Sequence, residues 1–440
     1  MMRIYLTLLV GLMLAAPAGA QDVLTLREAI DLAMQKNYDI QIARNEIEIA
    51  SNDATLGNAG FLPVSDLNLS AGRTVANTKQ SFLSGQTTER NGALTQRQAA
   101  GVGFSWTVFD GFGRYRAYDR LKTVLSEEEY RADNTTELIL TDVVVSYYDL
   151  ARQQQQLRVL EEAVAISEER MRIVELRRDL GSASELEVRQ ARLDLNADRA
   201  SVLRQRTALV NARADFNQLL VRPLSLDYTV VDSIALDPPV ARDTLEAESL
   251  GRNKTLMVAR MARQVALIQS REVLSEWLPS VDVNAGLNYS NLNAEAGFLL
   301  SNESKDITYG ISLNMNLFDG MNRRRRAQNA EIRLRNADLV IDDITTRLQS
   351  DISRADQDYR NSLALIDIER ENLALARQNV DIALERFELG TITSIELREV
   401  QETLTRAQSL LLVAQFEAKR AETELQRLSG RLVKAFLPRE

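Results

Sequence analysis

The sequence predicts an internally duplicated α+β membrane protein, in which strands of a β-barrel lead into long coiled-coil helices. Three observations support this fold class. Long stretches contain no glycine or proline, the two halves of the chain repeat the same landmarks, and segments beside those landmarks alternate between apolar and polar residues. The first pattern is typical of long helices, and the alternation is typical of strands.

The N-terminus has the features of an export signal. Arg3 supplies a positive charge, residues 4–16 form an apolar segment, and Ala18-Gly19-Ala20 is a cleavage site. A retained membrane anchor is the weaker alternative, because a spanning helix needs about 20 apolar residues. We therefore expect a signal peptide over residues 1–20 and an exported mature chain, either soluble or a β-barrel.

Two stretches of the chain predict pairs of long helices, each pair folded at a single glycine. Between residues 114 and 250 the only glycine is Gly181, and between residues 321 and 429 it is Gly390. The first arm extends from about residue 111 to 180, which corresponds to about 105 Å of helix. Helices of this length are expected in coiled coils or tunnel walls rather than in a compact globular domain.

The two halves of the chain are copies of each other. The shared landmarks are Phe109-Asp110-Gly111 with Phe318-Asp319-Gly320, Leu180-Gly181-Ser182 with Leu389-Gly390-Thr391, Leu62-Pro63 with Leu278-Pro279, and Asn37 with Asn253. The first two pairs are 209 residues apart and the last two are 216 apart. An apolar residue also recurs every seven positions from Val143 and again from Ile352, which predicts left-handed supercoiling.

Between each proline and each Phe-Asp-Gly motif the apolar period changes from seven to two. Ile307, Tyr309 and Ile311, for example, alternate with small or polar residues. We expect strands at about 62–77, 99–110, 279–292 and 306–318, with lipid on the apolar face and water on the polar face. A soluble sandwich is the alternative. Because even eight strands leave an interior filled by side chains, four cannot enclose water, and three copies would supply twelve.

These landmarks predict the domain organisation. We expect a first structural repeat over residues 21–230, an inter-repeat equatorial segment over 231–244, and a second repeat over 245–440. Each repeat should contain a helix, two barrel strands, a long helix, a tip turn and a further helix. The residues after Gly430 should join the inter-repeat segment in a belt outside the helices.

The composition excludes several kinds of chemistry. The 440 residues include no cysteine and no histidine, so disulfides, thiolate, zinc and haem sites and histidine-dependent catalysis are excluded. The formal net charge of −9 argues against a nucleic-acid partner. We therefore expect no enzymatic activity, no metal and no cofactor.

Taken together, the two-fold repeat, the proline-led strands, the Phe-Asp-Gly exits and the glycine-turned tips resemble the TolC outer-membrane efflux protein family. The resemblance covers essentially the whole mature chain. It implies a homotrimer in the outer membrane, with a twelve-stranded barrel continued by a twelve-helix periplasmic tunnel. Its partners would be outer-membrane lipid, a periplasmic adaptor, and an inner-membrane efflux pump or ABC exporter of type I secretion. The alternative is a periplasmic coiled-coil adaptor or scaffold that does not enter a membrane.

The resemblance also implies a periplasmic gate. Family members carry acidic residues six and nine positions after the second tip glycine, and Glu396 and Glu399 occupy those positions here. Glu187 lies six positions after the first tip glycine. Phe387 replaces a family tyrosine, so we expect it to seal the gate by packing rather than by a polar latch. An acidic pair spaced by three is otherwise an ordinary solvated helix face, and this alternative remains open.

The tips themselves are the expected docking surface for the adaptor. The residues concerned are Gly181, Ser182, Ala183, Ser184, Gly390, Thr391, Ile392 and Thr393. A run of four arginines, Arg323 to Arg326, follows the second strand pair. It is either solvated charge or a contact with anionic lipid headgroups.

Overall fold

The computed structural model describes residues 23–297 and 299–436, so the expected signal peptide over residues 1–20 lies outside the described residues. The chain divides into two compact units. The first comprises the described residues of Met1–Gln41, Thr135–Asn253 and Arg347–Glu440, and the second comprises Ile42–Asn134 and Lys254–Thr346. Each unit therefore combines corresponding parts of both sequence repeats.

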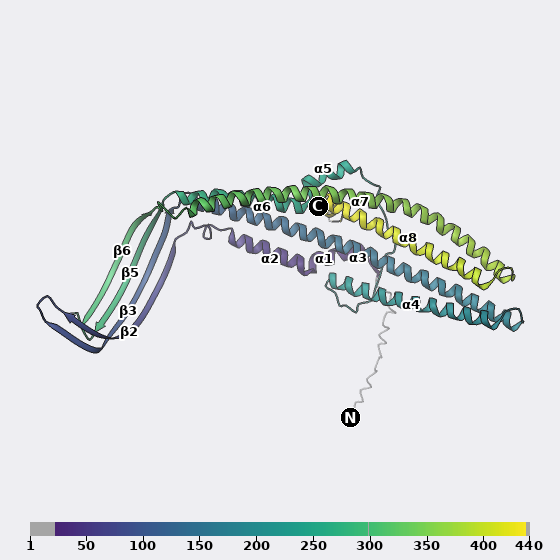
Figure 1. Cartoon of the computed structure of the whole chain (residues 1–440), viewed down its shortest axis with the longest axis horizontal. Coiled ribbons are helices and arrows are strands. Elements are labelled where there is room, and N and C mark those ends of the chain that lie inside the picture. Colours follow the sequence, from purple (N-terminus) through teal and green to yellow (C-terminus); the bar gives the residue numbers. More distant parts are fainter. Residues whose placement is uncertain (1–22, 298, 437–440) are drawn as a thin grey trace, which may run out of the picture. The chain divides into compact units, whose positions relative to one another are not determined.

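The helices show the internal duplication directly (Figure 1). The long helices α3 (Gly113–Asp179) and α7 (Asn322–Glu388) have 67 residues each. The first residue of α7 follows the first residue of α3 by 209 positions, and the last residues have the same offset. The returning helices α4 (Glu185–Leu219) and α8 (Ser394–Leu428) have 35 residues each, at the same offset. The prediction of two helical hairpins, each turned at one glycine, is confirmed.

Shorter helices precede each strand pair. They are α1 (Leu26–Lys36) and α2 (Tyr38–Asp53) in the first repeat, and α5 (Arg242–Arg252), α6 (Lys254–Glu272) and the 3₁₀ helix η1 (Val273–Trp277) in the second. The break between α1 and α2 lies at Asn37. The Asn37 side-chain amide donates to the carbonyl of Leu219 at 3.1 Å, where α4 ends. Asn253 donates to Leu428 at 3.1 Å in the same way, so the two asparagines bind the ends of the returning helices.

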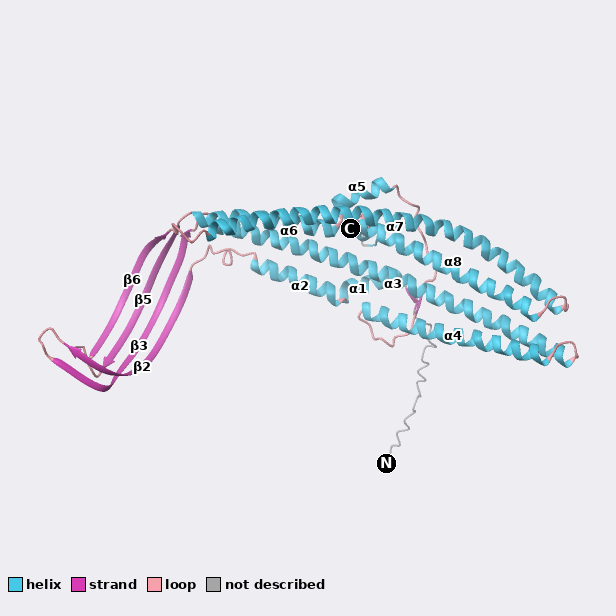
Figure 2. Cartoon of the chain, in the orientation of Figure 1, coloured by secondary structure: helices cyan, strands magenta, loops and turns pink. Residues whose placement is uncertain are grey.

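The four long strands form one antiparallel sheet in the second unit (Figure 2). The order is β2 (Val64–Ser81), β3 (Thr87–Phe109), β5 (Ser280–Ala294) and β6 (Ser301–Asn314). The β2–β3 hairpin is longer than expected, because the polar segment from Thr87 onward still pairs with the end of β2. In contrast, β6 ends before the expected residue 318, because its last partner is Ser280, where β5 begins.

The register gives the sheet one apolar face and one polar face. Leu67 of β2 pairs with Val102 of β3, and Val102 also pairs with Leu287 of β5. Leu287 in turn pairs with Ile307 of β6. All four side chains are exposed, so the described part of the chain leaves them uncovered.

On the opposite face of the sheet, the residues paired across the four strands are polar or glycine. Asn68 pairs with Gly101, Gly101 pairs with Asn288, and Asn288 pairs with Asp306. An apolar face and a polar face on long strands are the pattern expected of a wall between lipid and water.

In each repeat an aspartate joins the strands to the long helix. The Asp110 carboxylate accepts a hydrogen bond from the backbone N–H of Arg114 at 2.7 Å, and Asp319 accepts from Arg323 at 2.8 Å. Each carboxylate thus satisfies a free N–H group in the first turn of its helix.

The inter-repeat segment is held against the helices of the first unit. The short strands β1 (Val23–Leu24) and β4 (Thr229–Val230) pair in parallel, and the C-terminal helix α9 (Leu432–Phe436) follows α8. The Lys419 ammonium donates to the carbonyl of Ala235 at 3.0 Å and to the Glu422 carboxylate at 3.1 Å. Burial raises the pKa of Glu422 to about 7.

Candidate gate and docking site at the helical tips

The first tip connects α3 to α4 through a left-handed glycine. Gly181 has a φ of +74°, and the N–H of Ser182 donates to the carbonyl of Arg177 at 2.8 Å. The Ser184 hydroxyl accepts from the N–H of Glu187 at 3.3 Å, and the Glu187 carboxylate accepts from the N–H of Ser184 at 2.8 Å. This reciprocal arrangement is a capping box that starts α4.

The second tip has the same geometry 209 residues later. Gly390 has a φ of +75°, and the N–H of Thr391 donates to the carbonyl of Arg386 at 2.9 Å. The Glu396 carboxylate accepts from the N–H and the hydroxyl of Thr393 at 2.7 and 2.9 Å. Glu396 thus closes the capping box of α8.

The three acidic residues expected at the gate therefore have different surroundings. Hydrogen bonds from Thr393, first from its N–H and then from its hydroxyl, lower the pKa of Glu396 below its usual value. Glu187 has the equivalent capping role in the first tip. Glu399 is exposed, and within the described part of the chain its carboxylate makes no hydrogen bond or ion pair. Glu399 is thus the one of the three whose carboxylate has no hydrogen-bond partner among the described residues.

Apolar residues of both hairpins pack together directly above the tips. Phe387 is only 1% exposed, and the guanidinium of Arg177 lies over its ring at 4.9 Å. The tip core combines Met171, Ile173, Val174, Val188, Ala191, Leu195, Ala383, Phe387 and Leu397, with Ala183 and Ile392 packed against it. Phe387 therefore lies in the apolar contact between the two hairpins of one chain.

Arg177 also makes the two tips different. A Cβ atom on Gly390 would lie 2.5 Å from a terminal nitrogen of Arg177, whereas a Cβ on Gly181 would meet nothing within 4 Å. The second tip is therefore covered by a side chain of the first hairpin, while the first tip is open.

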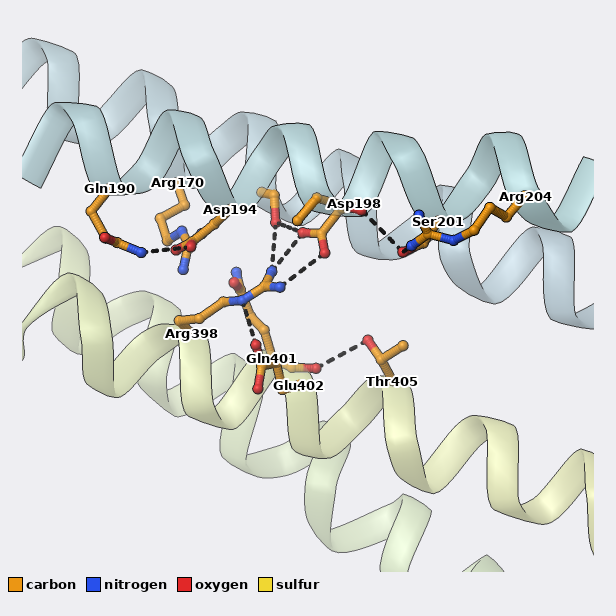
Figure 3. A network of polar contacts seen from close by, with 12 residues as sticks. Arg170, Gln190, Asp194, Asp198, Ser201, Arg204, Arg398, Gln401, Glu402 and Thr405 are labelled. Carbon is orange, nitrogen blue, oxygen red and sulfur yellow. Dashed lines mark hydrogen bonds and ion pairs between the residues drawn. The ribbon is translucent and has the colours of Figure 1, made fainter.

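Polar side chains connect the two hairpins in the tip half of the returning helices (Figure 3), where Arg398 lies four residues after the start of α8 and Asp198 lies thirteen residues after the start of α4. Arg398 of α8 points toward α4 and donates to both carboxylate oxygens of Asp198, at 2.5 and 2.9 Å. Asp198 also accepts from the Ser167 hydroxyl of α3 at 2.6 Å. A bidentate pair of this kind is stronger than an ordinary hydrogen bond and fixes the orientation of its partners.

A second, buried arginine lies beside this pair. Arg170 of α3 is 0% exposed and donates to Asp194 of α4 at 2.9 Å. Burial lowers the pKa of Arg170 below its usual value. Among the described residues, two nitrogens of Arg170 and both amide atoms of Gln401 have no hydrogen-bond partner.

We call Arg398, Asp198, Ser167, Arg170 and Asp194 the tip network. Sequence reasoning missed it, because each residue alone looks like solvated helix charge. The duplication does contain a signal. At the equivalent positions, 209 residues away, Asp198 is replaced by Ala407, Arg170 by Asn379 and Asp194 by Thr403. A comparison of the two repeats position by position could therefore have pointed to these three residues.

The described residues contain neither a metal-binding cluster nor a helix able to span a membrane. No group of three or more Asp, Glu, His or Cys side chains there is arranged to hold a metal ion. None of the helices described combines the length and apolarity that crossing a membrane requires.

Comparison with known proteins places the whole architecture in one family. The outer membrane efflux protein family matches residues 29–221 and 245–431. Protein CyaE of Bordetella pertussis is 26% identical over 415 residues, covering 92% of this chain and 84% of the relative. Outer membrane efflux protein BepC of Brucella suis biovar 1 is 21% identical over 427 residues, covering 97% and 89%.

Solved structures show the same fold. The outer membrane protein VceC from Vibrio cholerae superposes with a TM-score of 0.73 at 18% identity, covering 92% of this chain and 96% of that one. The channel-forming protein CusC gives a TM-score of 0.75 at 17% identity, with 92% of each chain covered.

Proposed function

The chain belongs to the outer membrane efflux protein family, and from that membership we propose that three copies assemble into one continuous export duct. A protein of this family is an outer-membrane channel that forms the exit duct of an efflux pump or a type I secretion system, and this chain has that function. In the proposed trimer, a twelve-stranded barrel leads into a twelve-helix periplasmic tunnel. The expectation of a non-membrane adaptor or scaffold does not fit this family.

The observation that carries the trimer is the open sheet. Among the described residues, β2 and β6 each pair with a strand on one side only. Long edge strands with free backbone groups pair readily with another chain. If β6 of one copy pairs with β2 of the next, three copies of the four-stranded sheet give twelve strands and no free edge.

The helices offer a second surface for a neighbouring copy. Two apolar stripes, in which each residue is more than half exposed, are Leu186, Leu193, Leu203 and Val210 on α4, and Ile368, Leu375 and Ile382 on α7 with Leu389 directly after it. Both stripes begin within five residues of a tip glycine. Spacings of mostly seven suit antiparallel coiled-coil packing, so we propose that the α4 stripe packs on the α7 stripe of the next copy.

At the tip end we propose a gate that the tip network holds closed. Arg398 and Asp198 tie α8 to α4 within each chain, and Phe387 seals the apolar contact beside them. Glu399 of three chains, with Glu396 beside it, would line the constriction with six carboxylates. Such a ring favours cations.

We further propose that the tip residues, Gly181 to Ser184 and Gly390 to Thr393, contact the helical hairpin of a periplasmic adaptor. An inner-membrane efflux pump or ABC exporter would deliver cargo to that assembly. The chain itself contributes a passage and no catalysis. The exposed side chains at the two tip turns are small or apolar, which suits helix packing.

The assembly is tested by extracting the protein from the outer-membrane fraction in mild detergent and measuring the mass of the complex by light scattering. We expect the mass of three chains. A stable single chain, or a protein that fractionates with the soluble periplasm, would contradict the proposal.

A further inference from the structure

The four consecutive arginines at the start of α7 divide into two pairs. Arg323 is buried, and its guanidinium lies over the ring of Trp277 at 4.8 Å. Arg326 forms an ion pair with Glu276 at 2.5 Å and approaches Asp319 at 3.3 Å. These two arginines therefore fasten α7 to the segment that leads into β5.

The other two arginines, Arg324 and Arg325, are exposed. Within the described chain neither forms an ion pair, and the side chain of Arg325 has only a 3.4 Å contact with Asn322. The first turn of α7 contains no acidic residue. Cations are unfavourable beside the positive end of a helix, so binding of an anion by these two exposed arginines would be favourable at this position.

The position of this pair indicates where that anion comes from. The exposed apolar series of β6 continues beyond the end of the strand until three residues before Arg324. We call this surface the collar; it consists of Ile311, Leu313, Met315, Leu317, Phe318 and Met321. In the proposed barrel the apolar face of the sheet would meet lipid chains, and the collar would mark the edge of the hydrocarbon region. Arg324 and Arg325 would then follow at the depth of the headgroups.

The first repeat shows what is specific to the second. Arg324 corresponds to Tyr115, which is 57% exposed, and tyrosine is typical of membrane interfaces. Arg325 corresponds to Arg116, whose guanidinium donates to the carbonyl of Arg271 at 2.5 Å. Among the described residues, the first repeat thus has an exposed tyrosine and a bonded arginine here, whereas the second has two exposed arginines without an ion pair.

We propose that Arg324 and Arg325 bind the phosphate of an anionic phospholipid in the periplasmic leaflet, while the collar contacts its acyl chains. Guanidinium groups match phosphate oxygens with paired N–H donors. A zwitterionic lipid carries its own ammonium beside the phosphate, so a lipid with net negative charge is bound more tightly. The inference rests on the barrel proposed above, because that assembly places the collar against lipid.

The test is native mass spectrometry of the complex purified from the outer-membrane fraction and supplied with equal amounts of phosphatidylglycerol and phosphatidylethanolamine. We expect the wild type to retain phosphatidylglycerol preferentially. The double substitution R324Q with R325Q should lower the retained ratio about tenfold. The substitution R324K with R325K keeps both charges and should retain most of the preference.

A matched control removes the same charge from exposed arginines further along α7. R333Q with R335Q should leave the lipid ratio unchanged, and soluble glycerol phosphate should not displace the lipid. An unchanged ratio in R324Q with R325Q, an equal loss in the control, or displacement by glycerol phosphate would each overturn the proposal. The same spectra report how many chains are present, so a wrong assembly is distinguished from a missing lipid.

Discussion

The two helical tips have the same backbone but different surroundings. Both turns use a glycine with a φ near +75° and both returning helices start with a capping box. Arg398 nevertheless pairs with Asp198 of the other hairpin, whereas its counterpart Arg189 approaches only Glu185, four residues earlier on its own helix, at 3.5 Å. The two repeats thus share their local backbone structure and differ in the contacts between hairpins.

This difference has an energetic consequence. The side chains of Arg398 and Asp198 are 21% and 14% exposed, while those of Arg189 and Glu185 are 75% and 59% exposed. Exposed ion pairs contribute little because water and salt screen them. The Arg398–Asp198 pair should therefore carry most of the electrostatic attachment between hairpins at the tips.

The largest expected effect concerns a property that the two tips share. Lysine at Ser182 or Thr391 would place a long charged side chain on the proposed helix-packing surface of the adaptor. We expect S182K and T391K to abolish export in a cell-based efflux assay while trimer and outer-membrane levels stay normal. T346K, on an exposed part of α7 away from the tips, is the control. Normal export in both tip variants would remove the tips from the docking surface.

The next effect separates the two tips. R398A leaves Asp198 with the Ser167 hydroxyl as its remaining side-chain partner, at a cost of about 1–3 kcal/mol to the closed arrangement. We expect a roughly tenfold or greater rise in open-channel probability in planar bilayers. The repeat counterpart R189A should behave like the wild type.

Removing both charges of the Arg398–Asp198 pair together tests whether the two residues act through each other. If Arg398 acts through Asp198, D198A with R398A should open the channel less than the sum of the two single variants predicts. Equal effects of R398A and R189A would show that the gate is held elsewhere.

The smallest effect concerns the acidic residues. Glutamine can replace glutamate in a capping box, so E396Q with E399Q removes charge and keeps the start of α8. We expect lower cation selectivity and weaker block by divalent cations in planar bilayers, with E187Q changing both less. Selectivity and block identical to the wild type in the double variant would make the acidic pair a solvated helix face.

Much of the fold follows from breaker residues and periodicity. The absence of glycine and proline predicts α3 and α7 to within a few residues, because nothing inside them interrupts a helix. The strand ends were less predictable. Residues 87–98 lack apolar alternation, yet they pair because the β2–β3 hairpin continues, and β6 stops where β5 offers no further partner.

Only the tip turns and the helix starts of the candidate site were predictable from the sequence. Gly181 and Gly390 must turn the chain, and the pattern Thr393 to Glu396 is a capping box that the sequence contains. Only the structure shows that the Glu396 carboxylate caps α8, whereas the Glu399 carboxylate has no partner among the described residues. The pairing of Arg398 with Asp198 depends on two helices packing side by side, and a spacing of 200 residues carries no periodic signal.

The central claim, that β6 of one copy pairs with β2 of the next in a closed ring of three, can be tested by cysteine cross-linking. The chain contains no cysteine, so every cross-link comes from introduced residues. Cysteine at Ser70 on the polar face of β2 is combined with cysteine at Ser304, Thr308 or Ser312 of β6 and oxidised in isolated outer membranes. The combination of Ser70 with Ser290, on an interior strand of the sheet, is the control. We predict cross-linked products of two and three chains and none larger in at least one β2–β6 combination, with none in the control. No cross-linking in any combination, or products longer than three chains, would contradict the account.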